Sequence, residues 1–412
     1  MSYAVSTRRR SLVLVLGFLL FLIDGYDLFV LGTVGPSLLA YQPWGATPAT
    51  LGLLGSVTAL GMPFGAIAAG WASDVWGRRL PLTVCLSWVS LFMLLSAFAP
   101  SLGMFVATRA ATGIGLGALV PVGVALVADA APPRRHSLFV GVALTGIAVG
   151  GFVTALVGRA LLPHMHFQRL FLVGALALLL IPLVRALVGR ELPQADRQAA
   201  AAPLAGRNKA AQLFQSGFGP ASMLFWVATF IALLLSYGAG TWLPTLMVKA
   251  GYDLSSALSF SMTFTLGAIV GTVVVTLIAD RGFLKATTLG CFLLAAVAML
   301  VLSTPQPRWL LLAMSALAGV GTLGTQNLIN AYVAQFYPAR LRSTALGFSL
   351  GVGRIGAIAG PSYIAAITIL ITVPKAGFYA FIVPAVIGAL VIAVVPARSR
   401  SSATTRPVEV PA

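Results

Sequence analysis

The feature that most constrains this fold is a series of long apolar runs separated by short polar stretches. A helix rises 1.5 Å per residue, so about 20 apolar residues cross roughly 30 Å of hydrocarbon. Backbone polar groups in lipid need partners within their own segment, which favours helices. The sequence therefore predicts an all-α membrane protein with twelve transmembrane helices, at residues 11–36, 50–72, 79–99, 102–129, 137–161, 169–189, 221–247, 255–279, 285–303, 308–334, 342–371 and 376–396.

Composition excludes a soluble domain, because 59% of the 412 residues are hydrophobic and only 8% are charged. Arg8, Arg9 and Arg10 before the first run resemble the start of a signal peptide. The apolar run continues without a small-residue cleavage site, so we expect a retained helix. Cys85 and Cys291 each lie in an apolar run and offer neither a disulfide framework nor a metal cluster.

One long polar interval divides the runs into two sets of six. It covers residues 190–219 and is rich in alanine, glutamine and proline. We predict an N-terminal six-helix half at residues 1–189, a cytoplasmic linker at 190–219 and a C-terminal six-helix half at 220–412.

The distribution of charge predicts the orientation in the membrane. Most of the 26 lysines and arginines lie in the two termini and in every second loop between runs. By the positive-inside rule, both termini and the linker are cytoplasmic. The net charge of +17 is then a signal of topology and of affinity for anionic lipid. The sequence lacks the interleaved aromatic and basic residues that would indicate a nucleic-acid partner.

Many of the 43 glycines lie inside the apolar runs, at spacings that let helix backbones approach closely. We expect such packing at Gly61, Gly65, Gly113, Gly115, Gly117, Gly267, Gly271, Gly347 and Gly351.

Two carboxyl groups interrupt the first run, at Asp24 and Asp27. A carboxylate in hydrocarbon costs several kcal/mol, so a chain that keeps two of them has a use for them. The i, i+3 spacing puts both on one face of a helix, where like charges resist ionising together. These properties suit a reversible proton carrier, and the alternative is a pair of structural acids hydrogen-bonded to neighbouring helices.

Arg109 and Arg354 are basic residues well inside apolar runs. Counting residues from the ends of the runs puts them at depths similar to those of Asp24 and Asp27. Two arginines and two aspartates can neutralise one another across a cavity, and a bound carboxylate would compete with an aspartate for an arginine. Arg109 is the better candidate to neutralise an aspartate, and Arg354 is the better candidate to bind a substrate.

The loop between the second and third runs reads Gly70-Trp-Ala-Ser-Asp74-Val-Trp-Gly77-Arg78-Arg79. It is similar to a signature of the major facilitator superfamily, as is the arginine and glycine pattern that follows Arg109. The resemblance implies the fold with six plus six helices and alternating access. It also implies a cytoplasmic gate, to which we assign Gly70, Asp74, Gly77, Arg78, Arg79, Asp129 and Arg342.

A narrower resemblance lies in Asp24-Gly-Tyr-Asp27 and in the stretch from Tyr337 to Pro361. Both resemble the aromatic acid:proton symporters. This implies a monomeric carrier in a bacterial inner membrane, driven by the proton gradient, that imports a benzoate-like or hydroxybenzoate-like acid. The alternative is an uncoupled or exporting carrier of another small organic anion, such as an aliphatic carboxylate.

Further side chains are candidates for contact with such a cargo. Four aromatic residues could stack on its ring or anchor the helices at the interface, and three amides could reach a cavity or bridge helices. They are Tyr26, Tyr237, Trp242, Tyr332, Gln326, Asn327 and Asn330.

The sequence carries no sign of an enzyme. It has no nucleophile–base pair, no HExxH motif, no paired cysteines and no Walker motif. His164 and His166 lie in an outer loop without further ligands nearby, so we expect neither a metal nor a cofactor.

Overall fold

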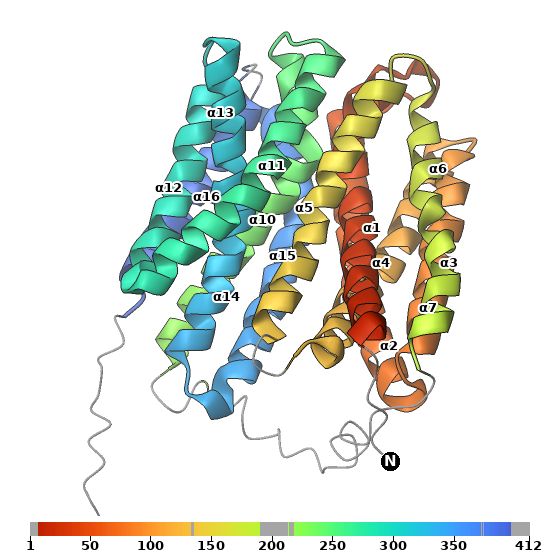
Figure 1. Ribbon diagram of the computed structural model, residues 1–412. Coiled ribbons are helices and arrows are strands. Elements are labelled where there is room, and N and C mark those ends of the chain that lie inside the picture. Colours follow the sequence, from red (N-terminus) through yellow and green to blue (C-terminus); the bar gives the residue numbers. More distant parts are fainter. Residues whose placement is uncertain are drawn as a thin grey trace, which may run out of the picture.

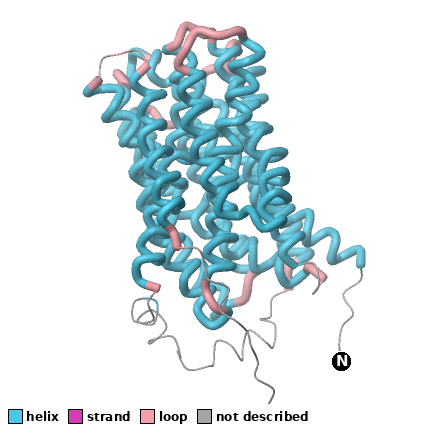
Figure 2. The backbone as a smooth tube through the Cα atoms, turned by 90° about the vertical axis from the view of Figure 1, so that its left-hand side faces the viewer, coloured by secondary structure: helices cyan, strands magenta, loops and turns pink. Residues whose placement is uncertain are grey.

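The computed structural model describes residues 7–132, 136–189, 213, 218–371, 373 and 375–396. These residues form a bundle of long helices joined by loops, and no strand occurs among them (Figures 1 and 2). The first part of the chain contains α1 (Thr7–Ala40), α2 (Pro48–Trp76), α3 (Arg79–Ala97), α4 (Leu102–Ala130), α5 (His136–Leu161), α6 (Leu170–Ala175) and α7 (Ile181–Leu187). The second part contains α10 (Gly219–Lys249), α11 (Leu254–Ile278), α12 (Leu284–Leu302), α13 (Arg308–Gly319), α14 (Thr325–Phe336), α15 (Ala339–Leu370) and α16 (Ala376–Val394).

Three short segments of other helical type join neighbouring α-helices. The 3₁₀ segment η4 (Leu176–Leu180) links α6 to α7, and the π-helical segments η5 (Ala279–Phe283) and η6 (Val320–Gly324) link α11 to α12 and α13 to α14.

The described residues contain eleven helices that are long and apolar enough to span a membrane. The predicted number of twelve is not confirmed by this count. The difference lies at Leu254–Leu302, which counts as one helix of 49 residues although the sequence predicts two spans there. Gly282 lies within it at φ 98°, a left-handed conformation that breaks the helix between α11 and α12.

Glycines bring the helix backbones into direct contact. A Cβ atom at Gly113 or Gly117 of α4 would overlap the carbonyl groups of Thr58 or Met62 on α2. Gly61, Gly65 and Gly267 likewise meet backbone atoms of a neighbouring helix, whereas Gly115 and Gly271 meet side chains of one. Close packing is therefore confirmed at seven of the nine predicted glycines.

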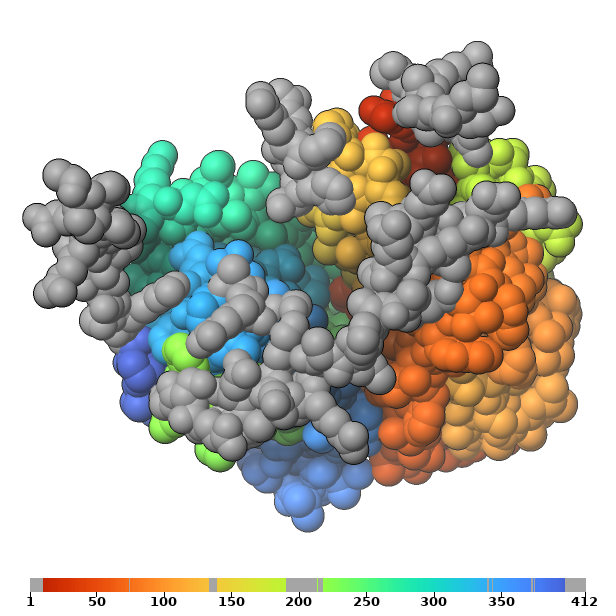
Figure 3. Space-filling view, turned by 90° about the horizontal axis from the view of Figure 1, so that it is seen from below, coloured from red at the N-terminus to blue at the C-terminus, as the bar shows by residue number. Residues whose placement is uncertain are grey.

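The prediction of close packing is wrong at Gly347 and Gly351 on α15. A Cβ atom at either position would meet nothing within 4 Å. Their part of α15 lies toward the end of the molecule where the N-terminus is drawn, and Gly70 and Gly141 near the same end are equally free of neighbours. Figure 3 views this end from below, with orange helices of the first part of the chain on the right and blue helices of the second part on the left.

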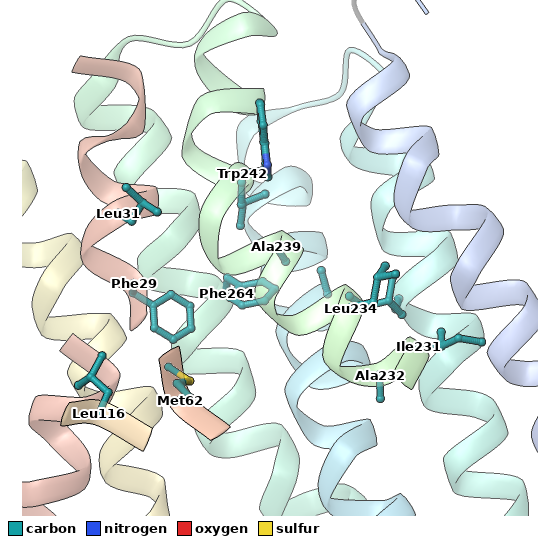
Figure 4. Packing of buried hydrophobic residues seen from close by; sticks show 14 of the residues in the cluster. Phe29, Leu31, Met62, Leu116, Ile231, Ala232, Leu234, Ala239, Trp242 and Phe264 are labelled. Atoms are coloured by element: carbon teal, nitrogen blue, oxygen red, sulfur yellow. The ribbon is translucent and has the colours of Figure 1, made fainter. Parts of the chain in front are cut away.

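The opposite end is closed by contacts between the two parts of the chain. Gly32 of α1 meets the backbone of Gly240 on α10, and Gly52 of α2 meets α15 at Pro361. Ser56 Oγ donates a hydrogen bond to the Ile358 carbonyl at 2.5 Å. A continuous hydrophobic core lies beside these contacts. Figure 4 shows part of it, with Phe29, Leu31, Met62 and Leu116 from the first part and Leu234, Ala239, Trp242 and Phe264 from the second.

The two classes of glycine give a direct test of this packing. Gly113→Val should destabilise the protein by about 2 kcal/mol or more, because the added carbons overlap α2. Gly351→Val is the matched control and should leave the thermal unfolding midpoint in detergent nearly unchanged. Equal losses in both variants would contradict the packing described here.

Candidate substrate site

A cavity of about 500 Å³ lies between the two parts of the chain. Residues of α1, α2, α4 and α5 line one side, and residues of α10, α11, α14 and α15 line the other. Most lining side chains are apolar, and the charged ones are Asp24, Asp280 and Arg354. An apolar cavity with few charged groups can hold an apolar ligand and fix its orientation through those groups.

Arg354 presents an unneutralised positive charge to this cavity. Its Nη1 donates a hydrogen bond to the Tyr237 hydroxyl at 3.1 Å and contacts the sulfur of Met62 at 3.4 Å. It forms no ion pair with any residue that the structure describes. A guanidinium in this setting gains from binding a carboxylate, because its planar fork can donate two parallel hydrogen bonds.

Asp24 lies on the wall of the same cavity, and only 6% of its surface is exposed. Among the described residues its carboxyl group has neither a hydrogen bond nor an ion pair within 4.0 Å. The charges that act on it are those of Arg354 and Asp27. Asp24 and Arg354 therefore present a carboxyl group and a guanidinium cation to the same cavity, with no ion pair between them.

Asp27 has the opposite environment, although it lies only three residues further along α1. Arg109 of α4 donates two parallel hydrogen bonds to its carboxylate, Nη1 to Oδ1 at 2.6 Å and Nη2 to Oδ2 at 2.8 Å. Asp27 is fully buried and Arg109 is 1% exposed. The guanidinium lies 5.5 Å from the ring centre of Phe171, and neither member of the pair lines the cavity. This bidentate pair is closed to ligands in this structure.

Three of the predicted aromatic contacts lie away from this cavity. The Tyr26 hydroxyl donates to the Leu170 carbonyl at 2.8 Å, and Trp242 Nε1 donates to the Pro361 carbonyl at 2.9 Å. Tyr332 packs edge-on against Phe225. Tyr26, Trp242 and Tyr332 therefore do not line the cavity in this structure, and their contact with a cargo stays a prediction. A polar group buried among apolar helices needs a partner, and Tyr26 and Trp242 find theirs in backbone carbonyls of the protein core.

The other predicted contacts are brought together. Tyr237, Gln326 and Asn327 line the cavity with Arg354, and Asn330 accepts a hydrogen bond from Gln326 Nε2 at 3.0 Å. Residues that sequence reasoning missed also line it, namely Met62, Ser236, Thr145, Thr272, Thr276 and Asp280. Hydropathy treats methionine as lipid-facing or core, so nothing in the sequence marks the Met62 contact with Arg354.

Comparison with known proteins identifies the family. The family model of the Major Facilitator Superfamily matches residues 17–361 and 262–410. The chain belongs to this superfamily. A gentisate transporter of Corynebacterium glutamicum is 36% identical, with 98% of this chain and 92% of that protein covered. A benzoate transport protein of Acinetobacter baylyi is 31% identical over 92% of this chain and 88% of that protein. A 4-hydroxybenzoate transporter of Pseudomonas aeruginosa is 33% identical over 84% of each chain.

Solved structures agree on the fold. A D-xylose–proton symporter superposes with a TM-score of 0.78 at 17% sequence identity, covering 93% of this chain and 97% of that one. A bacterial homologue of the human lysosomal transporter Spinster gives a TM-score of 0.69 at 16% identity, covering 95% and 96%. The predicted resemblance to aromatic acid carriers of the superfamily is thus confirmed, and the protein is a transporter rather than an enzyme.

The superfamily signature between α2 and α3 forms a charged cluster with α4 near the end of the molecule where α1 begins. Arg78 pairs with Asp129 of α4 and donates to the Ala125 carbonyl at 2.6 Å. Gly77 ends α2 with a φ of 73°, in the left-handed region that favours glycine. Gly70 lies in the last turns of α2, Arg79 begins α3 and Arg342 is exposed near the start of α15. The side chain of Asp74 lies outside the described set, and the gating role of all these residues stays a prediction.

We expect the two arginines to contribute very differently to the stability of the transporter. Arg109→Met leaves Asp27 buried without its partner and should cost about 3–5 kcal/mol. Arg354→Met removes a charge that has no ion-pair partner among the described residues, so it should cost little. Thermal unfolding in detergent distinguishes the two variants, and a larger loss for Arg354→Met would contradict these assignments.

Proposed function

We propose that this transporter is a proton-coupled symporter that imports an aromatic carboxylate by alternating access. The observation that carries the proposal is the arrangement of Arg354 and Asp24 on one apolar cavity, each without an ion-pair partner among the described residues. Relatives at 31–36% identity that are named as carriers of gentisate, benzoate and 4-hydroxybenzoate support an aromatic acid as cargo.

Arg354 is the proposed carboxylate anchor. In an apolar cavity a substrate anion needs a cationic partner, and the two parallel hydrogen bonds of an arginine suit a carboxylate. The Tyr237 hydroxyl already holds one edge of the guanidinium at 3.1 Å and so orients it. The apolar wall of the cavity then packs against the ring of the substrate.

Asp24 is the proposed proton carrier. Arg354 lines the same cavity as Asp24, and a positive charge near a carboxyl group favours its ionised form. A substrate carboxylate at Arg354 neutralises that charge, which favours binding of a proton by Asp24. Substrate and proton then cross together, because each favours the binding of the other. Asp27, which was predicted to share in proton coupling, acts here by holding α1 on α4 through Arg109.

Alternating access follows from movement of the two halves around this cavity. In the proposed topology residues 1–189 and 220–412 form the halves and residues 190–219 join them. Leu254–Leu302 crosses the membrane twice and turns at Gly282, because about 74 Å of straight helix exceeds any bilayer. Both termini and the linker face the cytoplasm of a bacterium. The carrier works as a monomer, and the proton gradient drives transport without a cofactor.

Asp24→Asn tests proton coupling. Asparagine keeps the shape of the side chain but does not titrate, so accumulation of a labelled aromatic acid driven by an inward proton gradient should fall to the level of equilibration. Counterflow exchange of labelled for unlabelled substrate should remain, because it needs no net movement of protons. Accumulation that still follows the pH gradient would contradict the role of Asp24.

Two substitutions of Arg354 test its role as the carboxylate anchor. Arg354→Lys should weaken substrate binding by about 1–3 kcal/mol, the range of a hydrogen bond to a charged group, and Arg354→Ala should abolish it. The neutral amide of a good substrate should compete poorly with the wild type and be insensitive to both changes. Competition assays check this, and equal losses for acid and amide would assign Arg354 to holding helices together.

A further inference from the structure

We infer that Gln326 and Asn327 form an amide subsite that binds a hydroxyl group on the ring of the substrate, with Asn330 as a positioning residue for Gln326. The inference rests on the proposed function, since it concerns the part of an aromatic carboxylate that Arg354 does not hold. It makes the carrier selective for hydroxylated rings.

Both amides belong to the cavity that holds the proposed anchor. Gln326 and Asn327 lie at the start of α14 and line the same cavity as Arg354 of α15. Most of the remaining wall is apolar. In such a cavity the few polar groups decide which ligand is accepted and how it is oriented.

The hydrogen-bonding capacity of these amides is largely unused. Gln326 donates one hydrogen bond to Asn330, at 3.0 Å, and its Oε1 atom is buried without a partner among the described residues. The second Nε2 hydrogen is also left over, because a carboxamide carries two. Asn327 is exposed on the cavity wall, and its side chain makes no hydrogen bond with the described residues.

A buried amide oxygen without a partner costs more free energy than a typical hydrogen bond contributes to stability. The terminal torsion of glutamine is soft, so a small turn of the Gln326 amide brings an oxygen or a nitrogen toward the cavity. A ring hydroxyl both donates and accepts a hydrogen bond, so it can satisfy either atom of the amide, whichever way the amide is turned. A hydrogen atom or a methyl group at the same place on the ring satisfies neither.

The backbone before the amides has an unusual geometry that orients them. Residues Val320–Gly324 form a π-helical turn, which shifts the positions that follow around the axis relative to a continuous α-helix. Thr325 Oγ1 donates to the Gly321 carbonyl at 2.5 Å, and Thr322 Oγ1 donates to the Ala318 carbonyl at 2.8 Å. These hydroxyls satisfy carbonyls around the turn and so stabilise the π-helical conformation. Such turns occur frequently at functional sites.

The experiment measures uptake of labelled benzoate into cells that express the full chain, in competition with the 2-, 3- and 4-hydroxybenzoates and the matching methoxybenzoates. In the wild type at least one hydroxybenzoate should compete about tenfold better than benzoate, and its methoxy analogue should not. Gln326→Leu and Asn327→Leu should each bring this ratio toward one. If one variant fails to reach the membrane, the other still decides the matter.

Thr276→Val is the matched control. Thr276 lines the same cavity, but its hydroxyl already donates to the Thr272 carbonyl at 2.7 Å, so the preference for the hydroxybenzoate should persist. A wild type that takes up benzoate without preferring any hydroxybenzoate would overturn the subsite alone. An unchanged preference in both leucine variants would do the same. Absence of any benzoate or hydroxybenzoate uptake by the wild type would overturn the proposed function along with it.

Discussion

The buried pair of Asp27 and Arg109 fixes the position of the helix on which the rest of the site depends. Two parallel hydrogen bonds of 2.6 and 2.8 Å tie α1 to α4 in a setting that excludes water. Two such bonds define the rotation of α1 about its axis as well as its height. Asp24, three residues earlier, is thereby held on the wall of the cavity. One acid is neutralised within the protein, and the other is left available.

Around this fixed helix, contacts between the two parts of the chain are unevenly distributed along the axis. Ser56, Gly32 and Gly52 meet their partners at the end remote from the termini. Toward the other end the cavity continues to Asp280, and the glycines of α15 and α5 stand free. Contacts between the two parts are therefore concentrated at one end, and in the proposed topology the other end faces the cytoplasm. A substrate held at Arg354 would leave toward the end with fewer contacts.

Hydropathy and residue counting predict the elements of this structure well, because both depend only on distance along a helix. They place Asp27 and Arg109 at one depth, where the structure joins them. They fail on rotation about the helix axis, which decides that Asp24 faces the cavity while Tyr26 and Trp242 face the core. A run that is apolar on all sides carries no signal of which side meets a ligand.

Two further differences have local physical causes. The π-helical turn before Gln326 changes the rotation of the residues after it, which a regular period of 3.6 does not anticipate. The turn at Gly282 lies within the π-helical segment η5, so α11 and α12 count as one continuous helix and the number of apolar helices differs from the number of predicted spans. The expected close packing at Gly347 and Gly351 is absent from this structure. Spacing along the sequence does not reveal which helix contacts exist in one particular conformation of a transporter.

The glycine contacts at the closed end bear on how easily the carrier changes shape. At Gly32 and Gly52 the helices meet with no side chain of the glycine between them, so separating them at these two positions changes the rotamer freedom of neither glycine. Gly347, Gly351, Gly70 and Gly141 leave equally smooth helix faces at the other end. Smooth faces at both ends keep either arrangement from becoming a deep energy minimum. The dwell time in each state can then be set by the ligand and the proton instead of by the scaffold.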